Sequence, residues 1–314
     1  MTSHMRVISQ ETFGGPEVLH FATVTRPSPE ANEVLVRVQA ASVNPADWKI
    51  RAGLVPRFGK PPFVLGRDFS GTVEATGSDV STFQVGDEVF GFASMPHGSH
   101  ADYVAVPTDQ IARKPSDLDH IHAAAVPLAG ATAWQPLVRV ANLQPGQRVL
   151  IHAAAGGIGH LAVQIAKSRG AFVIGTARTA KHKFLRELGA DELIDYTATK
   201  FETATGDVDV VLDPISDDYG LRSLDVLKPG GLLIDVRGTG PDRAPIRAEA
   251  SRRGLRFTEF GFTPSGADLA ELTVLITSGA LRVEVTDVLP LEAAAKAHQI
   301  VETGRVLGKV VLVP

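Results

Sequence analysis

The spacing of apolar positions differs between the two sides of residue 122. Before it, short runs of alternating apolar and polar residues occur, as in Glu33–Gln39 and Ser70–Ala75. Such alternation is typical of half-buried strands. Turn-forming segments rich in proline and glycine separate these runs, for example Arg26-Pro27-Ser28-Pro29 and Val85-Gly86-Asp87. The pattern predicts a compact, irregular β-barrel rather than repeated βαβ units.

After residue 122 the pattern predicts helices alternating with strands. An Ala-rich helical stretch, Ala123–Val140, is interrupted by Pro127 and Gly130. Helices are then expected at Ile158–Ser168 and at Lys181–Leu188, the second closed by Gly189. The expected strands are Arg148–His152, Ala171–Thr176, Asp191–Tyr196, Val208–Asp213, Gly231–Val236 and Leu255–Phe260. This alternation predicts a doubly wound parallel sheet, so the fold class is α/β.

The pattern of about the last 50 residues predicts that the chain ends in the first domain. Two helices, Ala267–Ser278 and Leu291–Thr303, precede a terminal strand, Lys309–Val313. We expect this strand to join the first domain and make it discontinuous. A chain of 314 residues also exceeds one comfortable core. The predicted domains are therefore residues 1–122 with 264–314, and residues 123–263.

Composition excludes several classes of protein. The formal net charge of −4 lacks the excess of basic residues that binding to nucleic acid or an anionic membrane requires. No run of 18 apolar residues or secretory leader occurs, which predicts a cytoplasmic protein. With no cysteine, disulfides and thiolate metal sites are excluded. The histidines show no HxxxH or HExxH spacing, so no metal site is predicted.

A glycine-rich segment joins the first strand of the second domain to its helix. It reads Ala153-Ala154-Ala155-Gly156-Gly157-Ile158-Gly159, with Ala154 at the first position of G-x-G-x-x-G and Gly156 and Gly159 at the others. The second glycine allows a pyrophosphate to approach, and the third allows the helix to pack closely. We expect residues Ala155 to Gly159 to bind a dinucleotide at the helix N-terminus. The alternative is an ordinary tight strand-to-helix turn.

The end of the following strand indicates which dinucleotide binds. NAD sites place an Asp or Glu here, whereas this chain has Ala177 followed by Arg178. A guanidinium can grip a ribose 2′-phosphate that a carboxylate would repel. We therefore expect NADPH rather than NADH, with Thr176, Arg178 and Lys183 at the cofactor site. The alternative is that these cations only form a solvated helix start.

Several further segments carry a family resemblance over essentially the full length. They are Gly14-Gly15-Pro16-Glu17-Val18-Leu19, Ser42-Val43-Asn44-Pro45-Ala46-Asp47-Trp48-Lys49, Gly66-Arg67-Asp68-Phe69-Ser70-Gly71, Val85-Gly86-Asp87-Glu88-Val89-Phe90-Gly91, Leu188-Gly189-Ala190-Asp191 and Gly304-Arg305-Val306-Leu307-Gly308-Lys309-Val310. With the glycine loop, they make the chain resemble a quinone oxidoreductase or 2-alkenal reductase of the medium-chain dehydrogenase/reductase superfamily. The resemblance implies a GroES-like catalytic domain, a Rossmann domain and a homodimer.

The resemblance also implies chemistry without zinc. Zinc-dependent members carry a catalytic Cys where this chain has Asn44 and a metal-binding His where it has Arg67. Reduction of an electrophilic acceptor needs no Lewis acid, since hydride can pass from NADPH directly to a quinone or to the β-carbon of an enone. We expect Arg67 and Asp68 to form a structural pair in the vacated metal position.

The resemblance places three neighbouring residues near the reaction. Asn44 is the first candidate for positioning the acceptor, with an Asn-Pro turn as the alternative. Lys49 is assigned to donate to substrate or cofactor phosphate, and a surface ion pair with Asp47 is equally open. Trp48 is assigned to the substrate cleft, with core packing as the alternative.

Other site residues are carried over from the family in the same way. Thr132, Tyr196, Gly308 and Lys309 are expected near the cofactor, although Lys309 is equally readable as an exposed strand-end charge. Phe260 and Phe262 are expected to line the substrate cleft or a subunit contact, with core packing as the alternative.

Two other functions stay open at this stage. One is an enoyl reductase acting on thioester or polyketide-like substrates, which uses similar cofactor motifs. The other is a non-catalytic, crystallin-like protein that binds NADPH without turnover. The leading expectation is NADPH-dependent reduction of a quinone or an α,β-unsaturated carbonyl.

Overall fold

A computed structural model describes residues 4–216 and 218–314 and divides the chain into two compact units. Unit 1 comprises the residues up to Ala131, Pro264–Ser278 and Val283–Pro314, and unit 2 comprises Thr132–Thr263 and Gly279–Arg282. The first division lies nine residues after the predicted one, at 131 rather than 122. The reason is packing, because Ala124 and Ala125 are buried against Ala40 of the β-rich unit.

Unit 1 is built from two sheets of mainly antiparallel strands. One sheet has the order β2-β1-β4, and the other has the order β15-β16-β3-β5-β6-β8, with β7 paired to β3. The strands are β1 (His4–Gln10), β2 (His20–Thr25), β3 (Glu33–Val43), β4 (Phe63–Val64), β5 (Asp68–Thr76), β6 (Glu88–Phe92), β7 (Tyr103–Pro107), β8 (Ile111–Arg113), β15 (Val285–Pro290) and β16 (Lys309–Val313). The predicted strands Glu33–Gln39 and Ser70–Ala75 lie within β3 and β5, so the β-rich fold expected for this part is confirmed.

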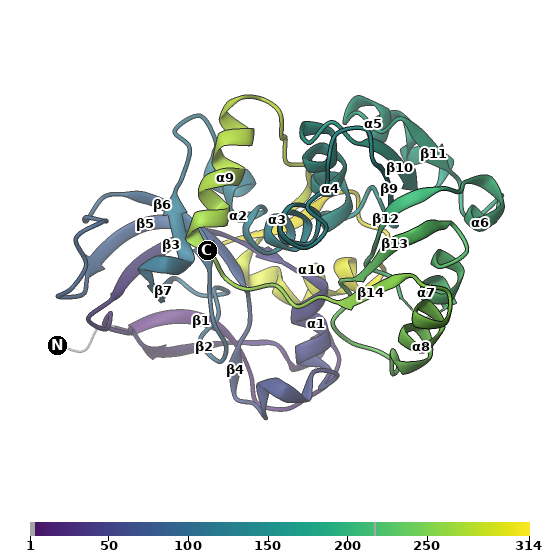
Figure 1. Cartoon of the computed structure of the whole chain (residues 1–314). Coiled ribbons are helices and arrows are strands. Elements are labelled where there is room, and N and C mark those ends of the chain that lie inside the picture. Colours follow the sequence, from purple (N-terminus) through teal and green to yellow (C-terminus); the bar gives the residue numbers. More distant parts are fainter. Residues whose placement is uncertain (1–3, 217) are drawn as a thin grey trace. The chain divides into compact units, whose positions relative to one another are not determined.

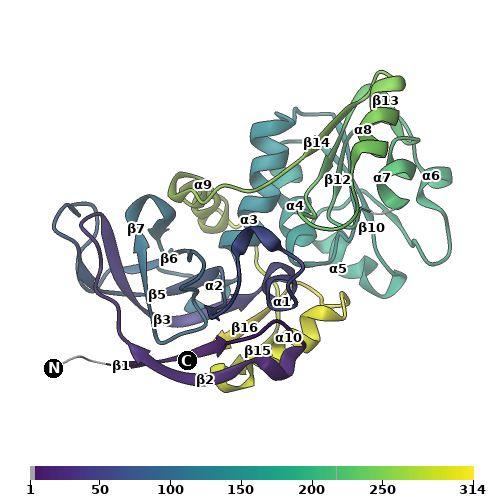
Figure 2. The ribbon, with the colours of Figure 1, turned by 90° about the horizontal axis from the view of Figure 1, so that it is seen from below.

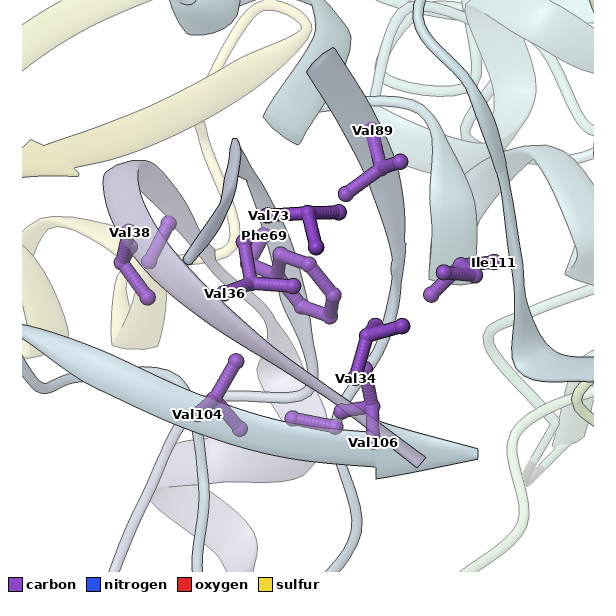
Figure 3. Close-up of a cluster of buried hydrophobic side chains, with 11 residues drawn as sticks. Val34, Val36, Val38, Phe69, Val73, Val89, Val104, Val106 and Ile111 are labelled. Atoms are coloured by element: carbon purple, nitrogen blue, oxygen red, sulfur yellow. The ribbon is translucent and has the colours of Figure 1, made fainter. Parts of the chain in front are cut away.

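Alternation along β3 fills the core of this sheet. Figure 3 shows Val34, Val36 and Val38 of β3 gathered with Phe69 and Val104 from neighbouring strands. All five are almost fully buried. Because the side chains of a strand alternate between faces, the apolar positions of β3 define which face carries the core.

The terminal strand returns to unit 1 as predicted. β16 pairs antiparallel with β3, with Val310 opposite Val43 and Leu312 opposite Ala41. Its other neighbour is the parallel strand β15, which the sequence pattern did not predict. The helices of this unit are α1 (Pro45–Arg51), α2 (His120–Ala124), α9 (Gly266–Thr277) and α10 (Ala294–Glu302). The two predicted C-terminal helices are therefore confirmed.

The Ala-rich stretch forms several short helices instead of one. After α2, Pro127 starts α3 (Pro127–Trp134), and a π-helical segment, Gln135–Val140, follows. Proline suits the first turn of a helix because its missing N–H would have no partner there. Pro127 is thus a helix start rather than an interruption.

Unit 2 contains one parallel sheet in the order β11-β10-β9-β12-β13-β14. Its strands are β9 (Arg148–Ile151), β10 (Phe172–Thr176), β11 (Glu192–Ile194), β12 (Val208–Asp213), β13 (Leu227–Asp235) and β14 (Arg256–Glu259). All six predicted strands are present, and β13 begins four residues before the predicted Gly231. The strand order reverses between β9 and β12, which is where doubly wound sheets bind ligands.

Helices cover both faces of this sheet. Figure 1 and Figure 2 show α4 (Gly157–Ser168) and α5 (His182–Glu187) on one face, and α7 (Asp218–Ser223) and α8 (Ala244–Arg252) on the other. A short helix, α6 (Phe201–Ala204), lies beyond β11. The doubly wound Rossmann fold is therefore confirmed. Within the described ranges, no helix combines the length and apolar character needed to span a bilayer.

Candidate functional site

The glycine loop of unit 2 joins the end of β9 to the start of α4. A Cβ atom added to Gly159 would lie 2.4 Å from the Ala153 carbonyl oxygen and 2.6 Å from the Ala154 Cα atom. Both are backbone atoms that cannot move aside, so only glycine fits. This close approach of α4 to the loop is what the third glycine of a dinucleotide fingerprint permits.

The loop is open on the side of Gly156. A Cβ atom there would have a single neighbour within 4 Å, the Ala153 carbonyl oxygen at 3.3 Å. Gly156 is also the N-cap of α4, and no side chain in the described part of the chain caps this end. The N–H groups of the first turn, with the positive end of the helix dipole, suit a pyrophosphate. The loop therefore has both the space and the donors that a dinucleotide needs.

Thr176, at the end of β10, supports the loop from below. Its hydroxyl accepts a hydrogen bond from the Ala153 amide at 3.3 Å, and its carbonyl oxygen accepts one from the Ala154 amide at 3.1 Å. Ala153 itself has a φ of 48°, a left-handed conformation that is uncommon for alanine. Since the Thr176 side chain is fully buried, its described contacts hold the loop.

His152 is a residue at this site that the sequence reasoning missed. It directly follows β9, and its Nδ1 atom lies 3.2 Å from the Thr176 hydroxyl. The available signal was a polar residue that ends an apolar strand immediately before the glycine loop. The apolar pattern predicts it only as the last residue of the strand Arg148–His152.

Arg178 and Tyr196 come together at the ends of β10 and β11. The Arg178 Nε atom donates to the Tyr196 hydroxyl over 3.2 Å, and both side chains are exposed. Lys183, near the start of α5, is also exposed. Burial and, to a lesser extent, the charge of Arg178 lower the pKa of Lys181. Arg178 and Tyr196, two residues predicted at the cofactor site from different strands, are thus neighbours.

Asp195, the residue before Tyr196, is a carboxylate held by hydrogen bonds within its own turn. Asp195 accepts from the Thr179 amide at 2.8 Å and from the Thr197 amide and hydroxyl at 2.9 and 2.6 Å. Hydrogen bonds from the Thr179 and Thr197 side chains hold the pKa of this carboxyl far below its usual range. Its oxygens are therefore engaged in shaping the turn that carries Thr179.

Two further carboxyl groups lie side by side where β12 and β13 end. Asp213 and Asp235 are register partners in the sheet. Asp213 accepts from the amides of Ile215 and Ser216 at 2.8 and 2.9 Å, and burial raises its pKa to about 6. Asp235 forms a buried ion pair with Arg243 at 2.6 Å. In the sequence, Asp213 is predicted only as the end of a strand, and the pairing of Asp235 with Arg243 is not predicted at all.

In unit 1, four polar residues form a buried group that we call the Asp68 cluster: Ser42, Asn44, Asp68 and Lys309. One carboxylate oxygen of Asp68 accepts from the Ser42 hydroxyl at 2.5 Å and from the side-chain amide of Asn44 at 2.9 Å. Its other oxygen accepts from the backbone amide of Leu128 at 2.9 Å. The Lys309 Nζ atom lies 3.6 Å from Asp68 and donates to the Asn44 carbonyl oxygen.

The Asp68 cluster corrects two sequence-based interpretations. Lys309 is only 4% exposed, so the interpretation as an exposed strand-end charge is wrong. Burial lowers its pKa, against the attraction of Asp68 and Asp47. Asp68, expected to pair with Arg67, forms its ion pair with Lys309. Arg67 donates to the Ala93 carbonyl at 3.1 Å, and its guanidinium lies over the Phe58 ring.

Asn44 is the N-cap of α1, and its backbone amide donates to the Asp47 carboxylate at 2.7 Å. Both polar ends of its side chain are bonded within the Asp68 cluster. This geometry favours the alternative in which Asn44 holds its turn, while the catalytic role stays a prediction. Asp47 is fully buried, so a surface ion pair with Lys49 is wrong. Burial raises the pKa of Asp47.

The remaining predicted residues are spread over both units. Trp48 packs against the apolar cluster that contains Val43 and Leu291, which favours its core interpretation. Gly308 has a φ of 65°, and a Cβ atom there would lie 2.3 Å from the Glu284 carbonyl oxygen. Its backbone packing thus requires glycine. Thr132 is buried, and Phe260 and Phe262 are half-buried; their contacts with ligands stay predictions.

Metal ligands do not gather at any place in the described ranges. No group of three or more His, Cys, Asp or Glu side chains there is arranged to hold a metal ion.

Comparison with known proteins identifies the family. Residues 30–116 match the alcohol dehydrogenase GroES-like domain, and residues 188–312 match the family model described as zinc-binding dehydrogenase. A quinone oxidoreductase of Lama guanicoe is 33% identical over 98% of this chain and 97% of its own. The 2-methylene-furan-3-one reductase of Solanum lycopersicum is also 33% identical, over 99% of this chain and 80% of its own.

Solved structures agree with the sequence relatives. The quinone oxidoreductase of Coxiella burnetii has a TM-score of 0.93 and 38% identity, covering 99% of this chain and 100% of its own. The Escherichia coli quinone oxidoreductase, solved with NADPH, has a TM-score of 0.89 and 31% identity over 98% and 100%. The chain therefore belongs to the quinone oxidoreductase branch of the medium-chain dehydrogenase/reductase superfamily and is an oxidoreductase.

Proposed function

We propose that this protein uses NADPH to reduce a quinone or an α,β-unsaturated carbonyl, without a catalytic metal. The observation that carries the proposal is the glycine loop, which is open at Gly156 and has an uncapped helix N-terminus beside it. The NADPH complex of the Escherichia coli relative supports the choice of cofactor. The tomato relative supports the choice of acceptor, because its name describes a ketone conjugated to a double bond.

We assign two parts of the dinucleotide, the pyrophosphate and the adenosine 2′-phosphate, to residues of unit 2. The amides at Gly157 to Gly159 would hold the pyrophosphate, and Gly156 leaves the space for it. Arg178, Tyr196 and Lys183 would hold the adenosine 2′-phosphate, where Ala177 replaces the acidic residue of NAD sites. Bound NADPH would supply a hydride to an electrophilic acceptor.

The Asp68 cluster supports the metal-free part of the proposal. It includes Asn44, the position where zinc-dependent relatives carry a cysteine. Here the Asn44 carbonyl oxygen accepts from an ammonium group, and the neighbouring carboxylate is saturated with donors. A divalent cation would have to displace Lys309 from both partners. Incubation with zinc or with a chelator is therefore expected to leave the reductase rate unchanged.

The test is a comparison of NADPH and NADH with three acceptors: a quinone, an enone and an enoyl thioester. We expect NADPH to be preferred and the quinone or enone to be reduced. Arg178→Ala should raise the KM for NADPH about tenfold, since one exposed charge-assisted contact is lost, and leave the KM for NADH unchanged. Arg186→Ala is the matched control, because Arg186 is an exposed cation on α5, the helix that follows the Arg178 turn.

Three outcomes would contradict the proposal in different ways. A preference for NADH would remove the cofactor assignment. Reduction of the thioester alone would favour the enoyl reductase alternative, and NADPH binding without turnover on any acceptor would favour the crystallin-like alternative. The cytoplasmic location and the homodimer stay predictions, and light scattering in solution tests the second by whether the particle has twice the mass of the chain.

A further inference from the structure

His152 connects the glycine loop to a helix on the opposite face of the sheet. Its imidazole is fully buried, with Nδ1 3.2 Å from the Thr176 hydroxyl and Nε2 3.0 Å from the Ser223 hydroxyl. Ser223 is the last residue of α7, and Thr176 is the residue whose hydroxyl accepts from the Ala153 amide. The ring therefore lies between α7 and the backbone of the loop.

The ring is neutral, which suits both of its partners. Burial, with the nearby charge of Arg222, lowers the pKa of His152 to about 3. A neutral imidazole has one donor nitrogen and one acceptor nitrogen. Hydroxyl groups can donate or accept, so Thr176 and Ser223 satisfy both nitrogens. No other described polar contact of the imidazole is required to complete its hydrogen bonding.

Aromatic packing fixes the orientation of the ring. Phe201 and Tyr219 contact it edge-to-face, with ring centroids 4.5 and 5.0 Å away. The Arg222 guanidinium lies over both of these rings and pairs with Glu202 at 2.8 Å. Such packing leaves the imidazole little freedom to rotate. Thr176 is thereby held at a defined position under the loop.

We infer that His152 is a positioning residue of the dinucleotide site, which acts through Thr176 to hold the Ala153 turn that presents Gly156 and the first turn of α4 to the pyrophosphate. The inference rests on the proposed function, because it assumes that the loop binds NADPH. The Nδ1 end of the imidazole thus controls cofactor affinity, whereas the Nε2 end anchors the ring in the core.

Two substitutions separate the two ends of the ring. His152→Asn keeps a polar atom near the position of Nδ1, and His152→Gln keeps one near the position of Nε2. Each loses one buried hydrogen bond, so both should lose similar stability. We expect His152→Gln to raise the Kd for NADPH about fivefold to tenfold, the equivalent of one hydrogen bond. His152→Asn should stay within about twofold of the unsubstituted protein.

Ser223→Ala is the matched control, because it removes the Nε2 partner and leaves the loop side intact. NADPH affinity is measured by nucleotide fluorescence, and thermal unfolding monitors the fold. In steady-state assays the KM for NADPH should follow the Kd, while kcat at saturating NADPH stays unchanged. Hydrogen exchange of the peptide covering 152–160, without nucleotide, should be faster in His152→Gln than in His152→Asn.

The outcomes distinguish this inference from the proposed function. If the unsubstituted protein does not bind NADPH, the proposed function fails and the inference falls with it. If it binds NADPH but His152→Asn and His152→Gln weaken binding equally, or if affinity follows thermal stability in all variants, His152 is only a core residue. Should either variant fail to fold, Ser223→Ala and Thr176→Val repeat the comparison from the partner side.

Discussion

The Asp68 cluster of unit 1 and the glycine loop of unit 2 differ in whether their polar groups are bonded within the protein. In the cluster, a buried carboxylate, an amide and an ammonium satisfy one another, and every polar group of Asn44 and Asp68 is bonded. In the loop, no side chain among the described residues caps the N–H groups at the start of α4, and a Cβ atom at Gly156 would have one neighbour within 4 Å. One region is saturated with its own partners, and the other presents donors to a ligand.

This difference shows where family resemblance is a reliable guide to chemistry. The loop acts through backbone atoms, whose placement depends on where glycine is required, and glycine positions are visible in a sequence. The cluster acts through side chains, whose role depends on which partners reach them. The family pattern indicates Asn44 as a catalytic residue, whereas its hydrogen-bond partners favour a structural role.

The largest effect on stability is expected when the Asp68 cluster loses its ammonium group. Lys309→Met would leave the buried Asp68 carboxylate without its counter-ion, which typically lowers the free energy of unfolding by about 3–5 kcal/mol. Urea unfolding measures the loss. Adding Asp68→Asn to the same chain should recover part of it, because the uncompensated charge is removed. A loss below about 1 kcal/mol, the range of exposed ion pairs, would contradict the described burial.

The next prediction tests whether the two glycines of the loop have different tasks. Gly159→Ala places a methyl group against backbone atoms and should lower the free energy of unfolding by about 1–3 kcal/mol as well as abolish NADPH binding. Gly156→Ala meets a single backbone atom, the Ala153 carbonyl oxygen at 3.3 Å. Stability should therefore change by only about 0.5 kcal/mol, while the Kd for NADPH rises at least about tenfold. Equal stability losses in the two variants would refute this division.

The smallest effect concerns the buried histidines. The pKa of His152 lies near 3 in the folded state, below its unfolded value of about 6.5. The unfolded chain therefore binds a proton that the folded chain does not, and stability falls as the pH drops from 6.5 toward 3. The slope approaches about 1.4 kcal/mol per pH unit for one histidine.

Burial lowers the pKa of His100 and His298 in unit 1 in the same direction. Asp213, whose pKa is raised, acts oppositely, since it stabilises the fold more at low pH than above pH 6. Comparing His152→Asn with the unsubstituted protein isolates one histidine. Urea unfolding at pH 7.0, 6.0 and 5.0 should show a shallower pH dependence in the variant, and parallel curves would contradict the prediction.

Parts of the fold were predictable to the residue. β12 and β16 begin and end where the sequence pattern predicts them, because buried strands appear in a sequence as near-continuous apolar runs. By contrast, α1 was not predicted, since Asn44-Pro45 reads equally as a turn. In the structure it is an N-cap followed by a first-turn proline. A local pattern cannot separate these two uses of the same residue pair.

The site was predictable where it depends on local sequence and not where it depends on distant partners. The glycine loop and Arg178 follow directly from strand ends and spacing. The bond between Asn44 and Lys309 joins residues 265 positions apart, and no periodicity records it. His152 belongs between these cases: its place before the loop was visible, but its partners on β10 and α7 required the fold.

The pairing of β16 with β3 has a consequence for how the protein is made on the ribosome. The chain emerges in order, so β3, Asn44 and Asp68 are synthesised well before Lys309. All of unit 2 is made in between. Until then the Asp68 carboxylate has no ammonium beside it, and the edge of β3 that receives β16 is unpaired. A nascent chain therefore completes its inserted domain before the domain that surrounds it in sequence.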